Sequence, residues 1–239
     1  MKRLLTILLL LLAVQWQLSA QTVIDMHSGR VSGKTRQDYN YKAREEWQLR
    51  EDSIAYNDCI TRAFNYLYAD SLQAAQDLFE KALKLRPDAP GNSVVRHNIG
   101  RIFMVRKQWR DAVSLFTRIL EEQPSNIDVR EDRAACYIET NQHDKALKDY
   151  EYLVMLRPDE EQYHLFHAMM LSQTGAKYDA IDELDAILEA HEDYAEGYLI
   201  RASVYTEMGN KGYARRDLDH AVSLGVPKEE IQDLYEKLK

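Results

Sequence analysis

Cysteine and long apolar runs are scarce in this 239-residue sequence, and its 31 basic residues are fewer than its 39 acidic ones. Two cysteines are too few for a disulfide scaffold, so the fold must be held together by a hydrophobic core. The formal net charge of −8 argues against a general nucleic-acid or anionic-lipid surface, because both require clustered lysine and arginine. Charged residues (29%) and hydrophobic residues (45%) occur at the frequencies of an ordinary soluble globular protein.

The one long apolar run lies near the N-terminus and predicts a secretory signal peptide over residues 1–20. Two basic residues precede "LLTILLLLLAV" (4–14), and "QLSAQ" then offers the small residue Ala20 as a cleavage point. A membrane anchor is the alternative. A spanning helix needs about 20 apolar residues, however, and Gln15 and Gln17 interrupt this run.

The sequence after the expected cleavage point predicts an exported, soluble and periplasmic chain with no stable membrane insertion. Gln21 stands where a bacterial lipoprotein would need a cysteine. Residues 21–40 contain turn formers but no helical period, which predicts a flexible N-terminal tail. Residues 41–55 predict a flanking helix ahead of the main domain.

One sequence block occurs five times and determines the predicted fold. "AQDLFEKALKLRP" (75–87) is matched at successive offsets of 37, 34, 34 and 34 residues. Twelve residues before each block stands another small residue, followed three positions later by an aromatic residue or leucine. Each unit is therefore two helices joined by a short turn, with small residues where the helices approach closely. The paired small residues are Ala63 and Ala75, Gly100 and Ala112, Ala134 and Ala146, Ala168 and Ala180, and Ala202 and Ala214.

A period of 34 with this pattern of small and aromatic residues resembles the tetratricopeptide repeat family over residues 56–226. The resemblance implies an all-α fold: a right-handed superhelical solenoid of about five helix-turn-helix repeats. The first helix of each repeat would line a concave groove. Proline follows three of the second helices and is expected to stop them. "PKEEIQDLYEKLK" (227–239) predicts a capping helix that covers the last apolar face.

The repeat departs from its regular pattern at two places, and each departure predicts a local change in the backbone. The segment "DAPGNS" (88–93) lengthens the connection between the first and second units, where a proline and a glycine allow a sharp turn. The turn within each unit favours a residue that tolerates positive φ, as Asn141, Gly175 and Gly209 do. Lys107 stands at this position in the second unit, so we expect a distorted turn there.

The sequence predicts no enzymatic activity, no cofactor and no metal. "GRVSGKT" (29–35) looks like a phosphate-binding loop but has three residues between its glycines, and the motif requires four. His164 and His167 could ligate a metal from one helical face, yet no third ligand is identifiable, and ordinary helix packing is the preferred interpretation. Cys59 and Cys136 lie in units separated by a whole repeat, so we expect two buried free thiols.

The family resemblance implies that a partner would lie in the groove, on residues of the first helices. Apolar residues at one end predict a hydrophobic anchor, and carboxylates further along favour basic residues of the ligand. In the alternative interpretation, Ile60 and Phe64 only pack beneath the flanking helix and fill the groove. The candidate contact residues are Ile60, Phe64, Leu67, Tyr68, His97, Arg101, Met104, Asp128, Glu131, Glu139, Leu165 and Met169.

These patterns predict a non-enzymatic adaptor or scaffold that holds a peptide or protein partner in its groove, with no nucleic-acid partner. The alternative is a structural subunit of a cell-envelope assembly, bound through the convex face or the ends of the solenoid. The fold hosts many unrelated partners, so the resemblance does not identify the ligand.

Overall fold

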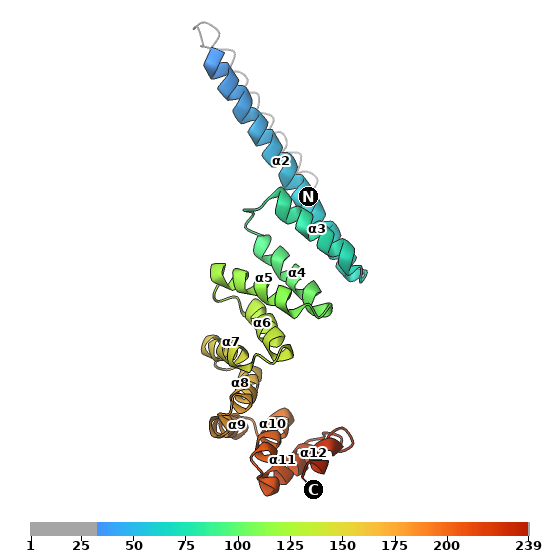
Figure 1. Ribbon diagram of the computed structural model, residues 1–239, viewed down its shortest axis with the longest axis vertical. Helices are drawn as coiled ribbons and strands as arrows, with labels where there is room; N and C mark the ends of the chain where they lie inside the picture. Colours follow the sequence, from blue (N-terminus) through green and yellow to red (C-terminus); the bar gives the residue numbers. More distant parts are fainter. Residues whose placement is uncertain (1–32, 239) are drawn as a thin grey trace, which may run out of the picture. The chain divides into compact units, whose positions relative to one another are not determined.

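The structure is a computed structural model that describes residues 33–238, with side chains described from Tyr41 onward. Throughout these residues the regular secondary structure is α-helical, without a strand (Figure 1). The expected signal peptide and most of the expected tail lie outside the described residues. The chain divides into two compact units after Cys59, and each unit is described by itself.

Helix α2 runs from Gly33 to Tyr68 and differs from the expected boundaries. The sequence predicts a tail up to residue 40, a flanking helix over 41–55 and a new helix from 56. One continuous helix of 36 residues is found over the described part of these segments. Neither proline nor glycine occurs between Lys34 and Tyr68, so nothing in the sequence interrupts the helical hydrogen bonds. Residues 41–50 of this helix are all exposed.

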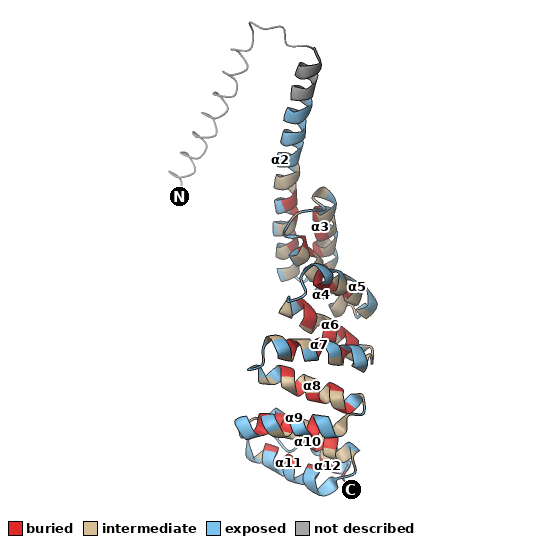
Figure 2. Cartoon of the chain, turned by 90° about the vertical axis from the view of Figure 1, so that its left-hand side faces the viewer, coloured by how far each residue is buried: buried red, intermediate tan, exposed pale blue. Residues whose placement is uncertain are grey.

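Residues 60–238 form five successive helix pairs and confirm the predicted all-α repeat architecture. Each second helix packs against the first helix of its own pair, and α3, α5, α7 and α9 also pack against the first helix of the next pair. Buried residues recur in every pair (Figure 2). The helices are the end of α2 with α3 (Leu72–Leu85), α4 (Asn92–Val105) with α5 (Trp109–Glu122), α6 (Ile127–Glu139) with α7 (His143–Leu156), α8 (Glu161–Gln173) with α9 (Lys177–Ala190), and α10 (Ala195–Glu207) with α11 (Lys211–Ser223).

The small residues of the repeat are buried at the contact between paired helices. In the second unit the approach is so close that a Cβ atom added to Gly100 would lie 2.3 Å from Cε1 of Phe116. The large residue at the matching position of each second helix fills the remaining space. These residues are Phe79, Phe116, Tyr150, Leu184 and Leu218, all buried.

The turns within the units share one backbone conformation, which corrects the distorted turn expected in the second unit. Lys107 adopts a φ of 57°, close to the 53° of Asn141 at the same repeat position. Asp70 fills this position in the first unit with a φ of 55°, and Gly175 and Gly209 are also at positive φ. The repeat packing therefore imposes the left-handed conformation even where the residue disfavours it.

The second helices end at equivalent positions whether or not proline follows. Helices α3, α5 and α7 end two residues before a proline. Helix α9 ends at the equivalent residue, Ala190, although Glu192 replaces the proline. There the backbone N–H of His191 donates to the carbonyl of Ile187, as the corresponding capping residues do in the other units. Proline thus reinforces a helix end that the tertiary packing already sets.

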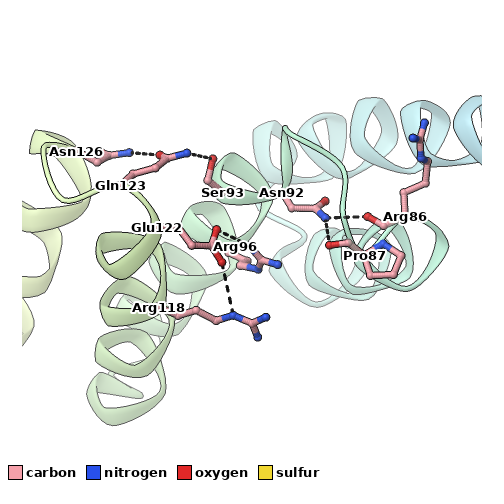
Figure 3. A network of polar contacts seen from close by, with 9 residues as sticks. All are labelled: Arg86, Pro87, Asn92, Ser93, Arg96, Arg118, Glu122, Gln123 and Asn126. Atoms are coloured by element: carbon pink, nitrogen blue, oxygen red, sulfur yellow. Dashed lines mark hydrogen bonds and ion pairs between the residues drawn. The ribbon is translucent and has the colours of Figure 1, made fainter.

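The lengthened connection between the first and second units is held by a buried asparagine (Figure 3). The side-chain amide of Asn92 donates to the carbonyls of Arg86 and Pro87, at 2.7 Å each. Gly91 has a φ of −79°, so the turn does not use glycine's access to positive φ. The side chain of Gln123 at the end of α5 donates to the hydroxyl of Ser93 at 3.2 Å.

The C-terminal segment covers the last helix pair, but with a shorter helix than the sequence predicts. Only α12 (Gln232–Glu236) is helical, and the residues after Pro227 form turns. Ile231, Tyr235 and Leu238 are buried in one cluster with Leu218 of α11. The hydroxyl of Tyr235 donates to Asp219 at 2.7 Å. Three side chains of this short, mostly non-helical segment therefore cover the last apolar face.

Candidate functional site

The first helices of successive units lie side by side and form one continuous face. Contacts join α4 with α6 and α8 with α10. Nε2 of His97 lies 2.7 Å from Oδ2 of Asp132, which links α4 to α6. The hydroxyl of Tyr163 in α8 donates to Glu131 in α6, and that of Ser172 donates to Glu207 in α10 at 3.3 Å. We call the surface of residues 60–68, α4, α6, α8 and α10 the inner face.

The two edges of the inner face are exposed in every unit described. At the C-terminal ends of the first helices the exposed side chains are Tyr68, Val105, Glu139, Gln173 and Glu207. At the N-terminal ends they are Val94, Asp128, Gln162 and Glu196. Because these positions recur with the repeat, a molecule lying along the inner face would meet both rows.

The chemistry of the exposed rows changes along the chain. Tyr68 is 90% exposed, Val94 55% and Val105 67%, which gives the first two units an apolar edge. In the third and fifth units the equivalent positions carry carboxylates, from Asp128 to Glu207. The inner face therefore has an apolar end and an acidic end.

The remaining apolar candidates at the first unit lie deeper than its exposed edge. Ile60, Phe64 and Leu67 are half-buried and pack against the core that contains Phe79 and Val95. The rings of Phe64 and Phe79 meet edge to face with centroids 5.3 Å apart. These three side chains pack inside their own unit. Tyr68 is therefore the candidate of the first unit whose side chain is most exposed to a partner.

The other candidates separate in the same way into packed and exposed groups. Met104 and Met169 are half-buried against core clusters, and Leu165 is 7% exposed within one. Arg101 is largely exposed, with its Nε 3.6 Å from Asp132. Asp128 and Glu139 are exposed. The position of a residue within the repeat did not by itself distinguish the packed candidates from the exposed ones.

Glu131, a candidate for attracting basic ligand residues, is engaged within the protein. It accepts the hydrogen bond of the Tyr163 hydroxyl. Burial of Tyr163, and then its hydrogen bond to Glu131, raise the pKa of that hydroxyl well above its ordinary value, so the proton stays on tyrosine. Asp128 and Glu139 are accordingly the carboxylates of the third unit with the freest access to a ligand.

Behind the inner face, charged pairs connect the two helices of the third, fourth and fifth units. Nη2 of Arg133 lies 2.6 Å from Oδ1 of Asp149, and Nε of Arg201 lies 2.8 Å from Oδ2 of Asp217. His167 and Glu183 take these positions in the fourth unit, at 2.5 Å. The sequence contains a signal for these pairs that the alanine spacing alone does not reveal: Arg or His precedes a repeat alanine, and Asp or Glu follows sixteen residues later.

His164 and His167 both contact one carboxylate. Their Nδ1 atoms lie 2.8 Å and 2.5 Å from the two oxygens of Glu183. Burial raises the pKa of Glu183, but hydrogen bonds from His167 and His164 outweigh this effect, and the net pKa is lowered. Across the described side chains, no group of three or more His, Cys, Asp or Glu residues has a metal-binding arrangement.

Both cysteines are buried free thiols. Burial, followed by the negative charges of Asp132 and Glu139, raises the pKa of Cys136 to about 12. The protonated thiol is a poor nucleophile at neutral pH. Among the described helices, none combines the length and apolar composition that crossing a bilayer requires.

The stacked helix pairs, the buried small residues and the shared positive-φ turns define a helical repeat protein of the solenoid class. The family model of the tetratricopeptide repeat matches residues 103–170. Residues 103–170 therefore contain repeats of the tetratricopeptide repeat family, as the sequence resemblance predicted for this part of the chain.

Solved structures of this family share the fold. A tetratricopeptide repeat protein from Parabacteroides merdae ATCC 43184 aligns with a TM-score of 0.72 and 23% identity, over 77% of this chain and 72% of that one. YrrB, described as a tetratricopeptide repeat protein with an unusual peptide-binding site, aligns with a TM-score of 0.61 and 20% identity, over 70% of this chain and 84% of that one. These likenesses concern the fold.

Curated relatives match only over part of their length. DnaJ homolog subfamily C member 3 from Gallus gallus is 25% identical over 96 residues, which are 40% of this chain and 19% of the relative. Anaphase-promoting complex subunit 3 from Schizosaccharomyces pombe is 26% identical over 152 residues, 60% of this chain and 22% of the relative. The chain thus spans about a fifth of the length of these relatives.

Proposed function

We propose that this protein is a non-enzymatic adaptor that holds a segment of a protein partner along its inner face. Tetratricopeptide repeat proteins generally mediate protein–protein interaction. The observation that carries the proposal for this chain is the change from exposed apolar to exposed acidic residues along the inner face. A segment with an apolar anchor followed by basic residues would complement both ends.

The two ends would contribute differently to binding. Burial of Tyr68, Val94 and Val105 would supply affinity, at about 25 cal/mol for each Å² of apolar surface removed from water. The carboxylates at Asp128, Glu139 and Glu196 would steer a basic segment into register and raise its association rate. Salt would then weaken the acidic contribution more than the apolar one.

We propose no chemical step, because the reactive side chains are buried or already engaged within the protein. The Cys136 thiol is protonated and buried, and the histidines of the fourth unit share Glu183 within the protein. The likeness to YrrB, which has an unusual peptide-binding site, supports a peptide-like ligand for this chain. We further propose an exported, periplasmic location, supported by the signal-peptide pattern of residues 1–20.

A second candidate function is a fixed structural subunit of an envelope assembly, bound through the second helices. Three large apolar side chains on these helices favour it, because each is mostly exposed. They are Met155 in α7 at 63%, Tyr178 in α9 at 77% and Tyr213 in α11 at 60%. Single exposed apolar residues are common on soluble proteins, so the adaptor is the preferred proposal.

Capture of partners with matched surface variants tests the two functions. The tagged protein and a Tyr68→Ala, Val105→Ser variant are used to capture partners from native extract, beside a Met155→Ser, Tyr178→Ala control. We expect the inner-face variant to lose a partner that the control retains. All substituted side chains are exposed, and circular dichroism checks the fold.

The opposite result would contradict the adaptor. If the partner is retained by the inner-face variant and lost by the control, the interface lies on the second helices. Size-exclusion chromatography of native extract provides an independent measurement. A fixed subunit would elute in one large stoichiometric complex, whereas an adaptor would also elute free of its partner.

A further inference from the structure

A cavity of about 580 Å³ opens beside the lengthened connection between α3 and α4 (Figure 3). The connection, the first turns of α4 and the last turns of α5 form its wall. Two arginines line it, Arg96 of α4 and Arg118 of α5. Neither belongs to the residues proposed to meet a partner on the inner face, so the cavity is a separate surface.

The guanidinium group of Arg96 is largely buried and has few bonds. Its side chain is 12% exposed. Among the described residues, Glu122 is the one group that bonds it, with Nη1 of Arg96 3.4 Å from Oε2 of Glu122. A guanidinium group has five N–H donors, and buried donors in proteins are normally matched by acceptors. Arg96 therefore retains unused donors where it lines the cavity.

The equivalent residues of the third and fourth units show which partners Arg96 lacks. Arg130 donates to the carbonyl of Pro124 at 2.6 Å and to the carboxylate of Asp149 at 2.9 Å. The ring nitrogens of His164 likewise lie 3.0 Å from a proline carbonyl and 2.8 Å from a glutamate of the same unit. This repeat position thus normally fastens a first helix to the proline before it and to the second helix of its own unit.

Both of these partners are lost in the second unit. The carbonyl of Pro87 accepts a hydrogen bond from the side-chain amide of Asn92 instead. Leu115 stands where Asp149 stands in the third unit, so no carboxylate is present there. Arg96 is thus released from the two contacts that engage its counterparts.

A second arginine takes the place of an aromatic ring beside Arg96. In the third unit, Arg130 lies over the ring of Tyr152, 3.8 Å from the ring centroid. Arg118 occupies this repeat position in the second unit; it is 63% exposed, with Nε 4.0 Å from Oε1 of Glu122. Two guanidinium groups therefore share one carboxylate (Figure 3). Because like charges repel, this cluster has an excess of positive charge that an anion would neutralise.

We propose that the cavity binds the carboxylate of an aspartate or glutamate side chain presented by a protein partner. The planar guanidinium group donates two parallel N–H groups to a carboxylate, which makes this pairing stronger than a neutral hydrogen bond. Arg96 supplies the buried donors and Arg118 the exposed ones. Glu122 is 50% exposed and competes with the ligand for the same two cations.

The rest of the wall suits the residues on either side of the acidic side chain. Leu83, Ala89 and Pro90 offer apolar contacts. The amide of Gln123 and the hydroxyl of Ser93 also line the cavity and can bond a peptide backbone. Asp88 lines it as well, but within the described part of the chain its carboxylate forms no ion pair. This site is independent of the proposed inner-face function, and so is its test.

Titration with blocked peptides tests the proposal. The protein carries isotope-labelled arginine, and NMR spectra follow the side-chain Nε–H signals of Arg96 and Arg118. The probe is acetyl-Ala-Glu-Ala amide, the neutral match is acetyl-Ala-Gln-Ala amide, and acetyl-Ala-Ala-Ala with a free carboxylate presents a chain end. We expect both signals to shift to saturation with the glutamate peptide, and affinity about tenfold lower for the glutamine peptide. The chain end should also bind more weakly, because it reaches less deeply towards Arg96.

Loss of one cation should weaken binding only when that cation lines the cavity. Arg118→Gln should lower the affinity for the glutamate peptide about tenfold. Arg110→Gln removes the same charge from an exposed residue of the same helix, outside the cavity, and should leave affinity within about twofold of the original. Both side chains are largely exposed, so the fold should persist.

Removal of the competing carboxylate should strengthen binding, which a damaged fold could not do. Glu122→Gln should raise the affinity for the glutamate peptide about threefold, because both guanidinium groups lose their internal partner. Glu121→Gln removes the neighbouring exposed charge, which does not line the cavity, and should leave affinity within about twofold.

Four results would overturn the proposal. Equal affinity for the glutamate and glutamine peptides would remove the role of the carboxylate. Equal weakening by Arg118→Gln and Arg110→Gln would mean that the peptide responds to net charge alone. Tighter binding of the chain end than of the glutamate peptide would assign the cavity to a C-terminus. A shift of the Arg101 signal without one of Arg96 would place the peptide on the inner face.

Discussion

At the residue scale, Gly100 and Phe116 lie so close together that adding one methyl group to Gly100 tests their contact. An added methyl group would overlap the ring of Phe116, which is fully buried and cannot move aside freely. Gly212 at the start of α11 offers a contrast, because an added Cβ would meet nothing within 4 Å. The same substitution therefore has opposite consequences at the two positions.

Gly100→Ala should destabilise the protein by about 1–3 kcal/mol, because overpacking forces the paired helices apart. Gly212→Ala should be neutral or stabilise by up to about 1 kcal/mol, because alanine loses less conformational entropy in a helix. Urea unfolding followed by circular dichroism measures both. A Gly100→Ala variant as stable as the original would show that the two helices do not approach as closely as described.

The left-handed turn residues give a second residue-scale prediction. Lys107 has a φ of 57° and an exposed side chain, so Lys107→Gly should remove backbone strain and stabilise by about 1 kcal/mol. Gly175→Ala, at the equivalent turn with a φ of 98°, should destabilise. Thermal unfolding of both variants provides the comparison. Stabilisation by Gly175→Ala would contradict the shared turn conformation.

At the scale of helix pairs, buried charges distinguish the later units from the earlier ones. Asp149 is 2% exposed and is bonded by both Arg130 and Arg133. In the first and second units the equivalent positions carry Leu78 and Leu115. The same helix contact is thus maintained by apolar packing in two units, by arginine–aspartate pairs in two and by the pair of His167 with Glu183 in one.

Removal of the Asp149 charge should be strongly destabilising. Asp149→Asn would leave two guanidinium groups without their carboxylate in a buried place, at a cost of about 3–5 kcal/mol. Glu151→Gln in the same helix removes an exposed charge and should change stability by less than about 0.5 kcal/mol. Urea unfolding of the two variants measures this difference. Similar values for both would mean that Asp149 is solvated in the native state.

The fourth unit should respond to acid through Glu183. Its folded-state pKa is lowered below the ordinary value of 4.5, so its contribution to stability is present above that pH and is lost as the pH falls further. The stability difference between the original protein and Glu183→Gln should therefore be largest near neutral pH and shrink below about pH 4.5. Thermal unfolding across this range, with Glu189→Gln as an exposed control, provides the measurement. A difference that grows in acid would contradict the lowered pKa.

Sequence periodicity predicted the helix pairs because the tightest contact of each pair accepts only a small residue. Alanine or glycine must recur there, as at Ala134 and Ala146, and the recurrence is visible without a structure. The pair of Arg133 with Asp149 was harder to predict, because Leu78 and Leu115 take the carboxylate position in the first two units and no single residue type recurs there. The half-buried state of Phe64 depends likewise on the packing of Phe79, which periodicity does not specify.

At the scale of the whole molecule, stacked repeats leave an apolar face at each end of the array. The C-terminal face is covered by Ile231, Tyr235 and Leu238, which bury themselves with Leu218 and Ala214. Nearest-neighbour stacking makes such a cover important, because these three side chains pack on α11 at the place where another unit would stack. The segment after Gly225 is therefore part of the fold.

Deletion of residues 227–239 should lower stability by about 5 kcal/mol, because burial of each large side chain contributes about 1.5–3 kcal/mol. The exposed face should also promote association, which light scattering detects. Glu236→Ala and Lys237→Ala, which alter only exposed side chains of the segment, serve as controls. A deleted chain that unfolds at the same urea concentration would show that the cover contributes little.

The longer connection before α4 has a practical consequence for observing the protein at work. Six residues separate α3 from α4, against four before each of α6, α8 and α10, and α4 itself begins one residue earlier in the repeat. Asn92 fixes the end of the connection through Arg86 and Pro87, and Asp88 and Pro90 are exposed. A short label sequence placed between Asp88 and Gly91 would thus lie beside Val94, outside the helices, and could report on partner capture at that edge of the inner face.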